Sequence, residues 1–162
     1  MNPRKEFISK SVEETKRIAA RLSGILPKGG FLALVGELGS GKTVFVKGLA
    51  KGLGVKNGDY VNSPTFVLIK EYEGKKKLYH FDLYRLKTEK EIEELGAQEY
   101  FFGDGIVAME WADKAPAILP KEHIRIEFSV LDDDKRKIRF IPFGARYKKI
   151  IQNLKFLPKM KI

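Results

Sequence analysis

A glycine-rich segment in the first third of the chain carries the clearest chemical signal in the sequence. Residues 36–43, GELGSGKT, match the pattern G-x-x-x-x-G-K-[ST] in full. Glycines in such a loop adopt backbone angles that turn successive amide hydrogens toward one anion. A lysine at the position of Lys42 reaches the β- and γ-phosphates, and a hydroxyl at Thr43 is a ligand for Mg²⁺. The segment predicts a nucleoside triphosphate site formed by Gly36, Gly39, Ser40, Gly41, Lys42, Thr43 and Val44.

The residues on either side of this loop are those that such a site requires. Residues 31–35, FLALV, form an uninterrupted apolar run, which is typical of a strand buried on both faces. A helix is expected from about Lys42 to Leu53. A phosphate bound between this strand and helix would lie at the N-terminus of the helix, where backbone amides and the helix dipole favour anions.

A phosphate-binding loop of this kind also needs a carboxylate that holds or organises Mg²⁺ at the end of a buried strand. Two residues meet that description. Glu110 ends the apolar run IVAM, at the strand end that approaches ligands in open α/β sheets. Asp82, in HFDLYR, ends a strand of alternating character. Both remain candidates, and each on its own could equally be a solvated strand end.

Ser63-Pro64-Thr65 lies between the loop helix and the next strand. Nucleotide switches place a threonine that senses the γ-phosphate in this interval. The other interpretation is a turn entering a strand, with Pro64 restricting the backbone.

The remaining pattern combines helices with hairpins. Ser11 and Glu14 have the spacing of a capping box, which begins a helix expected to run to about Leu26. Alternating segments at 66–84 and 124–143 each surround a turn and predict two β-hairpins, a departure from pure strand–helix alternation. Further helices are expected at 88–95 and 145–157.

Composition excludes several classes. The 162 residues are 43% hydrophobic and 32% charged, so an ordered globular chain is expected. No apolar run approaches the roughly 18 residues of a membrane span, the N-terminus lacks the apolar core of a secretion signal, and a cytoplasmic protein is expected. Cysteine is absent, so a metal must be held by oxygen ligands or by His80 and His123. The net charge of +10 fits either nucleic-acid binding or a solvated lysine-rich surface.

The motifs GELGSGKT, NSPTF, YHFDLYRL and MEWADK, in this order and spacing, resemble those of the TsaE (YjeE) family. These are bacterial P-loop ATPases required for the threonylcarbamoyladenosine modification of tRNA. The likeness runs from about Phe7 to Phe143. It implies an α/β fold of the P-loop NTPase kind, in which a mixed sheet has a parallel centre, antiparallel flanking hairpins and helices on both faces.

The resemblance also implies roles for individual residues. ATP and Mg²⁺ would be the cofactors, with Thr43 and Glu110 binding the metal. Asp82 would be needed for hydrolysis, and Thr65 would belong to a switch-like segment near the γ-phosphate. Trp111 would border the pocket, although a core position for this aromatic is also compatible with the sequence. Weaker candidates near the adenine are Ser11, Val12 and Asp134.

By the same resemblance the chain would bind TsaD and TsaB, and its ATP hydrolysis would support repeated cycles of tRNA modification. It would reach tRNA indirectly or through that complex and would not transfer the threonylcarbamoyl group itself. Residues 1–143 would form one ATPase domain. Residues 144–162 would add a basic helix or tail, packed through its apolar residues or in contact with tRNA or the partner.

Other functions remain open. A small-molecule kinase also has a P-loop, but no insertion for an acceptor site or an arginine-bearing lid is apparent. A GTPase would carry N-K-x-D, whereas residues 56–59 read KNGD. A basic RNA-binding module with a vestigial P-loop is the third alternative, and it would bind RNA even after Lys42→Ala.

Overall fold

The computed structural model describes residues 4–58, 61–62 and 68–155. Thr65, predicted as a switch residue, lies outside the described residues. A seven-stranded sheet in the described part of the chain has the order β1-β7-β6-β2-β5-β4-β3. The strands are β1 (Lys5–Ser9), β2 (Phe31–Gly36), β3 (Ile69–Tyr72), β4 (Leu78–Asp82), β5 (Ile106–Glu110), β6 (His123–Val130) and β7 (Arg136–Phe143).

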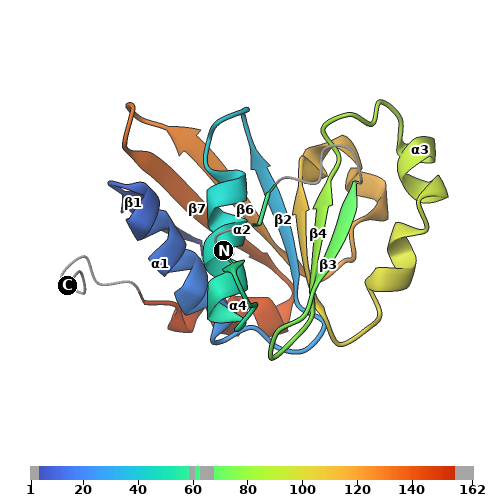
Figure 1. The fold of residues 1–162 in the computed structure, drawn as a ribbon, viewed down its shortest axis with the longest axis horizontal. Helices are drawn as coiled ribbons and strands as arrows, with labels where there is room; N and C mark the ends of the chain where they lie inside the picture. Colours follow the sequence, from blue (N-terminus) through green and yellow to red (C-terminus); the bar gives the residue numbers. More distant parts are fainter. Residues whose placement is uncertain (1–3, 59–60, 63–67, 156–162) are drawn as a thin grey trace.

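Strand direction confirms the mixed sheet (Figure 1). Strands β6, β2, β5 and β4 run parallel to one another and form the centre. At one edge β7 is antiparallel to β6 and β1 is antiparallel to β7, and at the other edge β3 is antiparallel to β4. Strand β1 is not among the elements predicted from sequence, because its five residues, KEFIS, gain their structure from pairing with β7, far along the chain.

Helices cover both faces of the sheet, as predicted. One core lies under α1, α2 and α4, and a second lies under α3 and three short 3₁₀ helices. The helices are α1 (Val12–Ser23), α2 (Lys42–Gly52), α3 (Glu89–Glu94), α4 (Ala145–Asn153), η2 (Ala97–Tyr100), η3 (Ala112–Lys114) and η4 (Pro116–Ile118). None of the helices in the described ranges is both long and apolar enough to cross a bilayer.

The two long helices of the first core touch closely. A Cβ added at Gly48 of α2 would lie 2.4 Å from the backbone oxygen of Lys16 in α1, so only glycine allows this approach. Helix α1 begins where predicted, because the Ser11 hydroxyl accepts a hydrogen bond from the Glu14 amide at 3.0 Å. It ends at Ser23 and not at Leu26, where the amides of Gly24 and Ile25 donate to the carbonyls three residues back and tighten the last turn.

Helix α4 lies at the end of the same core (Figure 1). Tyr147 and Ile151 are fully buried, and the Tyr147 hydroxyl accepts a hydrogen bond from the Phe31 amide at 3.0 Å. The helix ends at Asn153, short of the predicted Leu157. The ammonium of Lys5 donates to the carbonyls of Gln152 and Leu154 there. These contacts link the predicted basic tail, as far as Lys155, to β1 and β2.

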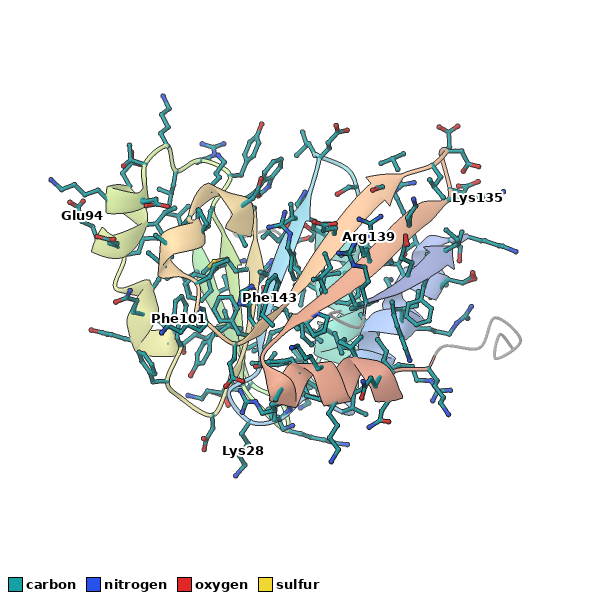
Figure 2. The ribbon with its side chains drawn as sticks, turned by 180° about the vertical axis from the view of Figure 1, so that it is seen from behind. Lys28, Glu94, Phe101, Lys135, Arg139 and Phe143 are labelled. Atoms are coloured by element: carbon teal, nitrogen blue, oxygen red, sulfur yellow. The ribbon has the colours of Figure 1, made fainter. Side chains whose placement is uncertain are left out.

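The antiparallel half of the sheet presents charged side chains on the face opposite the first core, where Figure 2 labels Arg139 of β7. Arg139 lies 3.5 Å from both Glu6 and Glu127, and Arg125 donates to Glu127 at 2.8 Å. Antiparallel sheets commonly leave one face to solvent in this way.

Candidate functional site

The glycine-rich loop connects β2 to α2 and ends in a left-handed residue. Gly41 precedes α2 with φ 109°, and Gly39 has φ 78°, so both positions need glycine. At Gly36 the limit is space, because an added Cβ would lie 2.6 Å from the Ser40 hydroxyl and 2.9 Å from the Phe128 carbonyl. The three glycines are therefore required for the loop to fold back onto the first turn of α2, as an anion-binding loop does.

Lys42 points back over this loop. Its ammonium donates to the carbonyls of Gly36 at 2.6 Å and Glu37 at 2.8 Å, and it lies 4.1 Å from the centre of the Trp111 ring. Burial lowers the pKa of Lys42, and the nearby carboxylates of Glu110, Asp82 and Asp113 partly oppose that shift. Lys42 is thus a buried cation held by loop carbonyls, at the place where the motif predicts phosphates.

Glu110, at the carboxyl end of β5, contacts both α2 and β4. The Thr43 hydroxyl lies 3.1 Å from each of its carboxylate oxygens. On the other side, His80 Nε2 lies 2.5 Å from Glu110 Oε2. Glu110 is 3% exposed and His80 is fully buried. The Glu110 carboxylate is therefore a buried group that is hydrogen-bonded from two elements.

Asp82 is next to Glu110 because β4 and β5 are parallel neighbours, with Asp82 and Glu110 paired in register. Alternation along β4 puts Asp82 on the same face as Leu78, which belongs to the core under α2. Its carboxylate accepts a hydrogen bond from the Tyr84 amide at 2.9 Å, and only 3% of Asp82 is exposed. Both carboxylates that the sequence left as candidates therefore lie at one edge of the sheet.

The opposite side of the site is made by two segments distant in sequence, the start of α1 and the turn between β6 and β7. Together with the loop they enclose a cavity of about 230 Å³. Its lining includes ten of the predicted site residues, namely Ser11, Val12, Gly39, Gly41, Lys42, Thr43, Val44, Glu110, Trp111 and Asp134. Gly36, Ser40 and Asp82 are outside the lining, and Thr65 is outside the described residues.

Four lining residues were not predicted: Thr15, Leu38, Asp133 and Arg136. Thr15 could have been found, since it follows Ser11 by one helical turn and shares its face of α1. Leu38 and Asp133 gave no chemical signal.

Arg136 connects the two sides of the cavity. Its guanidinium donates to the loop carbonyls of Ser40 at 3.1 Å and Gly39 at 3.3 Å. It also donates to the turn carbonyls of Asp132 at 2.8 Å and Asp133 at 3.3 Å. These acceptors are neutral backbone oxygens, so a positive charge borders the cavity and holds the β6–β7 turn against the phosphate-binding loop. Figure 2 labels Lys135, the neighbouring residue in this turn.

Trp111 fits both interpretations offered by the sequence. Its ring packs against the second core, and it also lines the cavity and faces Lys42. Its φ of 60° is unusual for a bulky residue, and such backbone strain tends to occur at functional sites.

The donor set suits Mg²⁺. Thr43 and Glu110 offer a hydroxyl and a carboxylate side by side, and Asp82 is their neighbour across the strand pair. Magnesium prefers such oxygen ligands and needs only one or two from the protein, because phosphates and water complete its shell.

Comparison with known proteins gives one consistent family. The model described as "Threonylcarbamoyl adenosine biosynthesis protein TsaE" matches residues 9–138. The tRNA threonylcarbamoyladenosine biosynthesis protein TsaE of Bacillus subtilis is 46% identical over 143 residues, 88% of this chain and 88% of the relative. The protein of that name from Aquifex aeolicus is 43% identical over 83% of this chain and 94% of the relative. The crystal structure of Bacillus subtilis YdiB matches with a TM-score of 0.83 and 38% identity, covering 95% of each chain.

Proposed function

This chain belongs to the threonylcarbamoyl adenosine biosynthesis protein TsaE family, a P-loop ATPase family, and from that premise we propose that it is a Mg²⁺-dependent ATPase that supports threonylcarbamoyladenosine modification of tRNA. The observation that carries the proposal is that two buried carboxylates lie beside the phosphate-binding loop. Glu110 contacts Thr43 at the start of α2, and Asp82 is its register partner on β4.

Each residue has a distinct part in this proposal. Lys42 leaves the carbonyls of Gly36 and Glu37 and pairs with the β- and γ-phosphates, as the amides of the loop do. Thr43 and Glu110 would hold Mg²⁺, which would supply positive charge to neutralise the phosphates. Asp82 orients the attacking water, since it is buried beside Glu110 with one oxygen held by the Tyr84 amide. Thr65 stays a proposed switch residue on the sequence motif alone.

The nucleoside part is proposed to lie against the second side of the cavity. Ser11, Val12 and Asp134 line it there, together with Trp111 closer to the loop. The adenine is assigned to this side because the phosphates require the other.

We further propose that the ATPase cycle acts on partner proteins of the TsaD and TsaB type, in the cytoplasm, with tRNA reached through their complex. The contacts of α4 with β1 and β2 support one ATPase domain that includes its terminal helix. No segment of the described fold forms a separate module for an acceptor metabolite. We therefore propose that ATP hydrolysis changes how the chain binds a partner protein.

The test is a reconstituted tRNA modification assay with TsaD-type and TsaB-type proteins. With wild-type protein and ATP, each complex should complete many turnovers of tRNA modification. With a non-hydrolysable analogue, modification should stop after about one turnover per complex. Lys42→Ala should behave like the omission of the protein. Lys51→Ala, which removes a charge from the exposed end of α2, is the matched control and should retain activity. Continued turnover with the analogue would contradict the proposal.

A further inference from the structure

His80 is a buried polar residue that the proposed reaction leaves without a role. It lies in β4, two positions before Asp82, so both side chains project from the same face of the strand. The ring is fully buried, and its Nε2 atom lies 2.5 Å from Glu110 Oε2. Burial of a polar ring at that position costs free energy unless it is hydrogen-bonded, and Glu110 supplies the bond.

The direction of this hydrogen bond follows from the partner. An ionised carboxylate offers only acceptors, so Nε2 carries the hydrogen and donates. The other ring nitrogen, Nδ1, is buried with no hydrogen-bond partner among the described residues. In the neutral ring with its hydrogen on Nε2, Nδ1 is a lone pair and leaves no donor unsatisfied. The arrangement matches an imidazole whose single N–H is directed at Glu110.

The consequence for Glu110 is that it is held from two elements. Thr43 contacts both carboxylate oxygens from the first turn of α2, and His80 contacts Oε2 from the middle of β4. A glutamate side chain has several rotatable bonds, and a cation gains most from a carboxylate that is already ordered. In the part of the chain that the structure describes, the other hydrogen bonds to this carboxylate come from the Thr43 hydroxyl, which is itself a proposed metal ligand.

We propose that His80 is a positioning residue that orients the carboxylate of Glu110 for a divalent cation bound with the nucleotide. The inference rests on the proposed function, because it assigns the cation to Thr43 and Glu110. His80 itself touches neither nucleotide nor cation. It acts through its hydrogen bond to Glu110 and so belongs to the support of the site.

Two substitutions separate orientation from simple packing. His80→Leu fills the buried space without a donor. His80→Gln places an amide N–H near the position of Nε2 and can restore the bond to Glu110. The measurement is the affinity for a fluorescent, non-hydrolysable ATP analogue at increasing Mg²⁺, with a parallel titration in EDTA.

His80→Leu should raise the Mg²⁺ concentration needed for half-maximal tightening by about 10- to 100-fold, the usual effect of losing an outer partner of a metal ligand. Its affinity for the analogue in EDTA should stay within about twofold of wild type, because Lys42 and the loop amides are unchanged. His80→Gln should recover most of the Mg²⁺ response. Should the leucine variant fail to fold, His80→Asn, whose amide is too short to reach Glu110, takes its place.

Leu78→Val is the control for packing, since Leu78 is fully buried on the same strand and face. It should lower the melting temperature and leave the Mg²⁺ response unaltered. Three results would overturn the role of His80. The first is a wild-type Mg²⁺ response in His80→Leu, and the second is equal impairment of the Gln and Leu variants. The third is that Leu78→Val shifts the required Mg²⁺ concentration as much as His80→Leu does. A wild-type protein that binds the analogue equally well with and without Mg²⁺ overturns the proposed function itself, and this inference with it.

Discussion

The two sides of the site differ in how far their residues are exposed. On the side of β4 and β5, Asp82 and Glu110 are each 3% exposed and held by side-chain and backbone hydrogen bonds. On the side of α1 and the β6–β7 turn, Val12 is 53% exposed, and the turn residues are exposed as well. There the link to the loop is Arg136, whose partners are backbone carbonyls.

This difference in exposure predicts different roles for the two sides. Buried carboxylates act in a medium where charge interactions are strong and positions are well defined, as catalysis requires. Exposed residues on a turn interact weakly through solvent and adapt to a ligand. Changes on the buried side should therefore act mainly on hydrolysis, and changes on the exposed side mainly on binding.

The largest effect is expected at Asp82. Asp82→Asn keeps the shape and the oxygen that accepts from the Tyr84 amide, so the fold should be retained. The rate of ATP hydrolysis with the partner proteins should fall by about 10²- to 10³-fold, because a positioned charge is lost from the reacting end. Nucleotide affinity should change by less than about threefold, because Asp82 lies outside the cavity lining. A tenfold change in affinity would need about 1.4 kcal/mol. Single-turnover hydrolysis and equilibrium binding measure the two quantities.

Asp104→Asn is the matched control for that substitution, because Asp104 is exposed and follows η2, away from the cavity. It should leave both quantities unchanged. An Asp82→Asn protein that hydrolyses ATP at the wild-type rate would remove the distinction between the two sides.

An intermediate effect is expected at Arg136. Arg136→Ala removes the hydrogen bonds that hold the turn to the loop, and it removes a positive charge from the cavity edge. Nucleotide affinity should weaken by about tenfold, corresponding to about 1.4 kcal/mol. The rate of hydrolysis at saturating ATP should stay within about twofold, because Asp82 and Glu110 are untouched.

Arg125→Ala provides the comparison for Arg136, since it removes an arginine whose hydrogen-bond partner is Glu127, outside the cavity lining. Calorimetric binding of an ATP analogue and steady-state hydrolysis distinguish the two variants. A collapse of the maximal rate in Arg136→Ala, with binding intact, would assign this side to catalysis as well.

The smallest effect is expected at Ser11, which caps α1 and lines the cavity. Ser11→Ala should lower the free energy of unfolding by about 1 kcal/mol, the usual cost of an N-cap. Thr88→Ala removes the corresponding cap of α3 on the other side of the molecule and should cost a similar amount. Only Ser11→Ala should also weaken nucleotide binding, by about twofold to threefold, in the range of a lost exposed contact. Urea unfolding with and without an ATP analogue measures both effects, and equal responses of the two variants would exclude Ser11 from the binding surface.

Local patterns predicted much of this site. The loop at 36–43 could be predicted from the sequence because its glycines, lysine and threonine act within one strand–loop–helix unit. Glu110 and Asp82 could be predicted because each ends a strand, and parallel strands bring their carboxyl ends to one edge. The hydroxyls of Ser11 and Thr88 each accept a hydrogen bond from the amide three residues later, as predicted, whereas the Glu14 carboxylate accepts from the Lys10 amide and not from the Ser11 amide that a full capping box uses.

The sequence by itself thus determined the phosphate-binding loop, the two carboxylates and the mixed character of the sheet. Tertiary structure decided the pairing of β1 with β7, the hydrogen bond from His80 to Glu110 and the bridge from Arg136 to Ser40, 96 residues away in the chain. The physical reason is that such contacts depend on strand order and register, which are set by packing of the whole sheet and leave no periodic signal near either residue.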